Sequence, residues 1–154
     1  MREAEFLADQ MKRAFHGEAW HGQSVLEVLQ GVTAAQAAAR PIAGAHSIWE
    51  IVNHISAWHP GALRRLQGEA LELVGEQDWP PVHERSETAW HQTLQQLNTG
   101  FYALYEAVRS LDDSRLQDRI ANRDHNVWFM LNGIVQHDLC HAGQIAVLKK
   151  AVVR

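Results

Sequence analysis

Apolar residues that recur at every third or fourth position constrain the fold of this chain more than any other feature of its sequence. The clearest stripe is unbroken over six steps of four or three residues. Its members are Trp90, Leu94, Leu97, Phe101, Leu104, Val108 and Leu111. Residues at this spacing share one face of an α-helix, and such a face packs against other helices at a shallow angle. The stripe therefore predicts a long helix that begins near Ser86.

Three other segments carry the same periodicity. One runs from about Arg2 to His16, a second begins after Ser47, and a third spans Val127 to Val152. Ser47 is a good N-cap because a glutamate follows three residues later, which completes a capping box. Pro60 lies within the second of these helices and predicts a kink or a break there. Because no segment alternates in the manner of a β-strand, we predict an all-α four-helix bundle.

The longest predicted connection, residues 69–83, joins the second and third long helices and contains Pro80 and Pro81. A connection of this length fits a bundle in which these two helices are not simple antiparallel neighbours. A chain of 154 residues is typical of one domain. We therefore predict a single bundle domain over residues 1–154.

Composition excludes several classes of function. The formal charge is −4 and no cluster of Lys and Arg is present, so we expect no nucleic-acid partner. With Cys140 as the single cysteine, an intrachain disulfide and an all-cysteine zinc site are excluded. No apolar stretch approaches the roughly 20 residues that span a bilayer, and the N-terminal residues lack the apolar core of a signal peptide. We therefore expect a soluble cytoplasmic protein that does not enter membranes.

Two histidines lie where the last predicted helix would otherwise place apolar core residues. The inward stripe of this helix consists of Met130, Ile134, His137, His141, Gln144 and Leu148. His137 and His141 are four residues apart, so their side chains stack on one face. An unpaired polar group in a core costs about 2–7 kcal/mol. A metal ion held between the two imidazoles would remove that cost.

His54 is the best candidate for a third ligand, because it lies on the apolar side of the second long helix. Zinc, nickel and ferrous iron accept neutral imidazole, and three protein ligands with open positions are typical of a catalytic site. The sequence thus predicts a divalent-metal site made by His54, His137 and His141. Nickel or zinc is the expected metal, with iron as the alternative.

Other interpretations of the histidines stay open. A stripe rotated by one position fits nearly as well, and its members are Val127, Leu131, Ile134, Asp138, His141, Ile145 and Leu148. That register keeps His141 inside and moves His137 toward the surface. His54 alone is also consistent with a core histidine bonded to a backbone carbonyl. His59, next to Trp58, would either line the mouth of the site or be an ordinary exposed histidine, and we favour the exposed position.

Residues 137–141, HDLCH, are similar to the His-Glu-x-x-His motif of zinc proteases. Those enzymes need a β-sheet that this sequence lacks, so a protease is disfavoured. Asp138 remains a candidate catalytic residue that would bond a metal-bound water or support a ligand, and the alternative is a solvated helix residue. Cys140 points about 100° away from His141, and we interpret it as a packing thiol.

Two segments resemble the DinB/YfiT-like family of small four-helix-bundle metalloproteins: residues 46–58, HSIWEIVNHISAW, and residues 136–145, QHDLCHAGQI. In that family, one histidine on the second helix and a His-x-x-x-His on the last helix bind a divalent metal. These positions correspond to His54, His137 and His141. The resemblance implies the same helix order and long second connection, and it implies a homodimer.

The resemblance also suggests an activity. Some members of the family are transferases or isomerases that use a low-molecular-weight thiol such as bacillithiol, mycothiol or glutathione. Our first hypothesis is therefore a metal-dependent enzyme that activates water or such a thiol. The alternatives are a non-catalytic metal-binding stress or scaffold protein, in which a fourth ligand such as His59 or Asp138 closes the site, and a structural dimeric bundle with hydrogen-bonded histidines.

Overall fold

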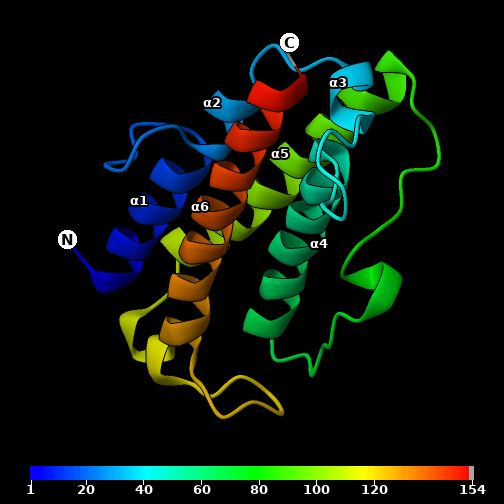
Figure 1. The fold of residues 1–154 in the computed structure, drawn as a ribbon. Coiled ribbons are helices and arrows are strands. Elements are labelled where there is room, and N and C mark those ends of the chain that lie inside the picture. Colours follow the sequence, from blue (N-terminus) through cyan, green and yellow to red (C-terminus); the bar gives the residue numbers. More distant parts are fainter. Residues whose placement is uncertain (153–154) are drawn as a thin grey trace.

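The computed structural model describes residues 1–152, and these are helical apart from their connections (Figure 1). The α-helices are α1 (Glu3–Phe15), α2 (Val25–Leu29), α3 (Ala34–Ala38), α4 (Ile48–Leu66), α5 (Glu87–Arg109) and α6 (Val127–Val152), with short 3-10 helices η1 (Gly75–Gln77) and η2 (Asp113–Gln117). No β-strand occurs within the described residues, so the all-α prediction is confirmed. None of these helices combines the length and the apolarity needed to cross a membrane.

The four long helices, α1, α4, α5 and α6, form the bundle. Helix α4 packs against α5 and α6, and α1 packs against the same two helices. Figure 1 shows α4 and α5 running in the same direction, because the long connection returns along the bundle before α5 begins. The prediction that these two helices are not simple antiparallel neighbours is confirmed. Helices α4 and α6, which carry the three predicted ligands, lie next to each other.

The predicted apolar stripes form the core. The buried residues of α5 are Trp90, Leu97, Phe101, Leu104 and Val108. Leu94 on α5 and Leu111, just beyond its end, are partly buried against the same core. The predicted N-cap at Ser47 is confirmed, since its side chain accepts a hydrogen bond from the Glu50 N–H. The side chains of Ser24 and Thr33 cap α2 and α3 in the same way. These bonds satisfy donors that a helix start leaves without partners.

Of the kink or break predicted at Pro60, the break is wrong, because α4 continues from Ile48 to Leu66. A proline inside a helix removes one backbone hydrogen bond. Packing against α5 and α6 holds α4 together on both sides of this position: His59 and Ala62 are buried in the core. Tertiary packing therefore overrides the local preference of proline.

The long connection is bonded to the side of α4. Trp58 Nε1 donates a hydrogen bond of 2.8 Å to Asp78 Oδ1. Asn53 Nδ2 donates one of 3.0 Å to the Pro80 carbonyl. These bonds hold residues 78–80 beside the middle of α4, where His54 lies.

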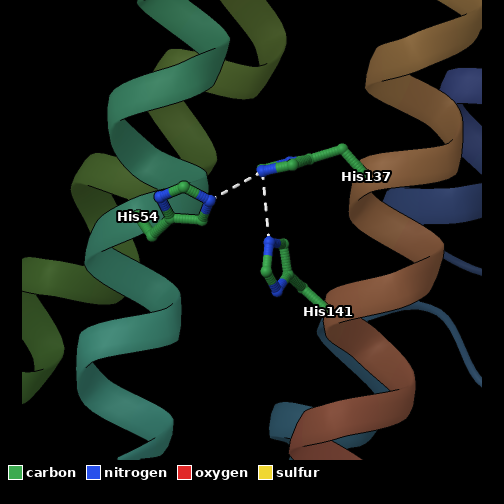
Figure 2. Close-up of side chains that lie close together, drawn as sticks. All are labelled: His54, His137 and His141. Carbon is green, nitrogen blue, oxygen red and sulfur yellow. Dashed lines mark hydrogen bonds between the residues drawn. The ribbon is translucent and has the colours of Figure 1, made fainter. Parts of the chain in front are cut away.

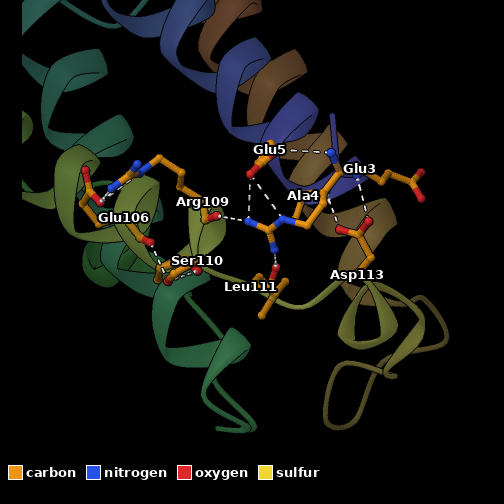
Figure 3. A network of polar contacts seen from close by, with 10 residues as sticks. Glu3, Ala4, Glu5, Glu106, Arg109, Ser110, Leu111 and Asp113 are labelled. Atoms are coloured by element: carbon orange, nitrogen blue, oxygen red, sulfur yellow. Dashed lines mark hydrogen bonds and ion pairs between the residues drawn. The ribbon is translucent and has the colours of Figure 1, made fainter.

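The start of α1 is anchored to the chain that follows α5 (Figure 3). The Asp113 carboxylate accepts hydrogen bonds from the N–H groups of Glu3 at 3.0 Å and Ala4 at 2.9 Å. The Arg2 guanidinium donates to the Leu111 carbonyl at 2.8 Å. Asp113 thus acts as a helix cap from a distant part of the sequence and also places a negative charge at the positive end of the α1 dipole.

The first prediction concerns this cap. Hydrogen bonds from the N–H groups of Ala4 and Glu3 lower the pKa of Asp113. A carboxyl group with a lowered pKa stabilises the fold above its unfolded-state pKa of about 3.9, and this contribution is lost as the pH falls through the folded-state pKa. We expect Asp113→Asn to lower the free energy of unfolding at pH 7, and we expect the difference from wild type to shrink below about pH 4.

Urea unfolding at a series of pH values measures this difference. Asp124→Asn is the matched control, because the Asp124 side chain is fully exposed. A difference for Asp113→Asn that does not change with pH would show that the charge of the cap is unimportant.

Candidate metal centre

The three predicted ligands meet in space. His54 projects from α4, and His137 and His141 project from successive turns of α6 toward it (Figure 2). His137 Nε2 lies 2.9 Å from His54 Nε2 and 3.1 Å from His141 Nε2. The ligand atoms of all three residues lie within 4.8 Å of one another.

These separations fit a bound metal ion. A metal–imidazole bond is about 2.0–2.1 Å long, so two imidazole nitrogens on one ion lie about 2.9–3.4 Å apart for bond angles between about 90° and 110°. The two nitrogen–nitrogen distances at His137 fall within this range, and all the ligand atoms lie within 4.8 Å of one another. The described helices therefore place two of the three donor pairs at the spacing that one ion requires.

In two of the three rings, the Nδ1 atom is hydrogen-bonded to an oxygen acceptor. His54 Nδ1 donates to the Asp78 backbone carbonyl at 2.7 Å, and His141 Nδ1 donates to Gln144 Oε1 at 2.7 Å. Because a carbonyl oxygen can only accept, each Nδ1 carries the hydrogen. In a neutral ring, Nε2 then presents a lone pair, which is the form that a metal binds.

A cation satisfies this arrangement better than a hydrogen bond does. His137 Nε2 faces the lone pairs of both His54 and His141, and a single N–H can be donated to only one of them. The other lone pair would stay unpaired in a site where both neighbours are more than nine-tenths buried. A divalent ion accepts all three lone pairs at once.

Burial keeps two of the rings in the form that binds metal. Removal from water lowers the pKa of His54. The same effect, helped by the nearby His137 and His54, lowers the pKa of His141 to about 4. Both rings are therefore neutral near pH 7, and protons do not compete with a metal ion for them.

The family comparison agrees with this geometry. A family model described as DinB superfamily matches residues 19–145. The chain belongs to the DinB superfamily. The matched region contains His54, His137 and His141, so the family predicted from the two short motifs is confirmed. Searches of curated proteins and of solved structures found no significant match.

Asp138 of this DinB-superfamily protein is buried rather than solvated, and so is His59. His59 Nε2 donates to both carboxylate oxygens of Asp138, each at 3.0 Å. Burial acts to raise the pKa of Asp138, but the facing His59 and His137 outweigh it and hold that pKa below its ordinary value. The interpretations of Asp138 as a solvated residue and of His59 as an exposed histidine are wrong.

The Asp138 carboxylate lies behind His137. Its Oδ1 is 3.7 Å from His137 Nδ1, which is too far for a hydrogen bond, and this nitrogen has no hydrogen-bond partner within residues 1–152. A carboxylate that accepts a hydrogen bond from a ligating histidine fixes the ring and makes it a stronger ligand, and Asp138 lies on the side of His137 from which it would do so. Of the two roles predicted for Asp138, this position favours support of a ligand over contact with a metal-bound water.

The buried face of α6 follows the second of the two predicted registers. Its buried residues are Val127, Met130, Leu131, Ile134, Asp138, His141, Ala142, Ile145 and Leu148. His137 is partly exposed at the edge of this face, and Gln144 is exposed. Cys140 is also exposed, so its interpretation as a packing thiol is wrong. The site lies at the edge of the α6 core stripe, where the two predicted registers share His141.

Sequence reasoning did not find two residues of the site, Asp78 and Trp79. The Trp79 indole stacks on the His54 ring with centroids 3.9 Å apart and on the His46 ring at 3.7 Å. Both residues belong to the long connection, whose path depends on its bonds to α4 and not on any local pattern. Neither helical periodicity nor motif spacing could therefore predict that Asp78 and Trp79 belong to the site.

The second prediction concerns Gln144, which is exposed but holds His141 through Nδ1. Loss of such an outer partner typically weakens metal binding by about 10- to 100-fold. We expect Gln144→Ala to have this effect on the affinity for Ni²⁺ or Zn²⁺, with little change in the stability of the metal-free protein. Gln136→Ala, another exposed glutamine on α6, is the matched control. Equal affinities of the two variants, measured by chelator competition, would remove Gln144 from the site.

Proposed function

We propose that this protein is a metal-dependent enzyme in which His54, His137 and His141 bind a divalent ion. Nickel or zinc is the proposed metal, with iron as the alternative. The observation that carries the proposal is the convergence of three Nε2 atoms from rings of which two have their Nδ1 atoms bonded to oxygen acceptors. Neutral imidazole is a good ligand for each of these metals.

An open coordination sphere supports catalysis over simple metal storage. Within residues 1–152, the group of side chains able to hold one ion contains the three histidines and no fourth member. His59 and Asp138, the candidates for closing the site, are bonded to each other. Three protein ligands with a free position are the pattern of catalytic rather than structural sites.

A bound ion would lower the pKa of a coordinated water or thiol and thereby supply a nucleophile near neutral pH. Neighbouring residues would hold the ligand rings in place around the ion. The Asp78 carbonyl and Gln144 fix two of the ligand rings, and Trp79 covers one face of His54. The homodimer and the cytoplasmic location expected from the sequence remain predictions.

Thiol transfer is the most concrete form of this proposal. In the reaction with 1-chloro-2,4-dinitrobenzene, the thiol sulfur forms a bond to the ring carbon, chloride leaves with the electrons of the carbon–chlorine bond, and the thiol proton passes to water. We expect the metal-loaded protein to accelerate this reaction with bacillithiol, mycothiol or glutathione above the uncatalysed rate. His137→Ala should lose the acceleration.

Absorbance at the wavelength of the thioether product follows the reaction directly. Metal-loaded protein that gives no rate above background with any of the three thiols would contradict thiol transfer. A non-catalytic metal-binding protein would then be the better account.

A further inference from the structure

A cavity of about 570 Å³ opens beside His141, one of the three histidines of the candidate metal centre. His141 and Trp79 form part of its wall, so the cavity shares residues with the candidate metal centre. Its apolar lining comes from three parts of the chain: the 42–45 turn, α4 and the last turns of α6. These residues are Ile42, Ala45, Ile51, Val147 and Leu148. Volumes of 300–1,000 Å³ with mostly apolar walls are typical of small-molecule sites.

No charged side chain lines this cavity: its described wall contains no Asp, Glu, Lys or Arg. Two cations near it in the sequence, Arg40 and Lys149, are engaged elsewhere. Arg40 pairs with Glu50, and the Lys149 ammonium donates to the backbone carbonyls of Val28 and Gln30. A charged group placed in the cavity would therefore lose water without gaining an opposite charge.

The few polar groups of the wall lie on the side of the metal centre. Gln144 offers an amide whose oxygen is already bonded to His141. His46 stacks on the Trp79 face opposite to His54. A ligand in the cavity would thus meet polar groups near the histidines and apolar surface farther along α6.

We propose that this cavity binds an uncharged, largely apolar part of the substrate, with the reacting polar atom directed to the three histidines. The inference rests on the proposed function, because it assigns the substrate class of the same site. The apolar part of the substrate would lie in the cavity. Any charged part of the substrate, such as the carboxylates of glutathione, would stay outside it.

Three thiols of different character test this proposal on the Co²⁺-loaded protein, with thiolate-to-cobalt absorption under argon as the readout of binding. Phenylmethanethiol carries an apolar ring, 4-(mercaptomethyl)benzoate adds a charge to that ring, and 2-mercaptoethanol lacks it. Burial of the ring predicts that phenylmethanethiol binds about 10- to 100-fold more tightly than 2-mercaptoethanol. The carboxylate analogue should bind about tenfold more weakly than phenylmethanethiol, since no cation lines the cavity.

A matched pair of variants locates the effect. Val147 on the cavity wall is 58% exposed and Val74 in the long connection is 60% exposed, so both tolerate a glutamate. Val147→Glu should weaken phenylmethanethiol about tenfold and leave cobalt content and 2-mercaptoethanol binding unchanged. Val74→Glu should change none of these quantities.

The binding results test the apolar cavity and the metal centre separately. Cobalt-loaded protein that binds all three thiols equally, or prefers the carboxylate analogue, would overturn the apolar cavity and leave the metal centre intact. Equal effects of Val147→Glu and Val74→Glu would also overturn it. Failure to bind cobalt at all would overturn both the inference and the proposed function.

Discussion

The packing of α4 against α6 places His137 Nε2 about 3 Å from the Nε2 atoms of both His54 and His141. Several nearby contacts hold these rings in place. Lone pairs that face one another in a buried site repel unless a shared hydrogen or a cation lies between them, and one N–H on His137 can serve only one of its two neighbours. The Asp78 carbonyl fixes His54 in the tautomer that exposes its Nε2 lone pair. The long connection returns along α4, and its bonds to that helix place this carbonyl beside the ring.

The buried pair of His59 and Asp138 lies next to the candidate metal centre. Such a pair adds little net stability, although removal of one partner costs about 3–5 kcal/mol. His59 Nδ1 has no hydrogen-bond partner within residues 1–152, and its ring packs edge-on against Phe15 and Phe101. A purely apolar pair would suit this core at least as well. The Asp138 carboxylate lies 3.7 Å from His137 Nδ1, so the pair places a negative charge beside one of the three predicted ligands.

Periodicity and capping residues predicted the helices well, because these signals are local: the α5 stripe and the Ser47 cap are examples. The grouping of the three histidines could be predicted because a histidine on an apolar face is costly without a partner. The errors were of another kind. Burial of His59, exposure of Cys140 and continuity of α4 through Pro60 depend on how neighbouring helices pack. Trp79 reaches the site through a loop whose path no local pattern specifies.

The central claim is that His54, His137 and His141 hold one divalent ion, and metal content tests it most directly. Elemental mass spectrometry would be applied to gently purified, tag-free protein and to His141→Ala, with His91→Ala as a control because His91 is exposed on α5. We predict about one nickel, zinc or iron per chain in wild type and His91→Ala, and loss of that metal in His141→Ala. Wild-type protein that is metal-free, and that neither binds added metal nor changes its melting temperature, would contradict the account.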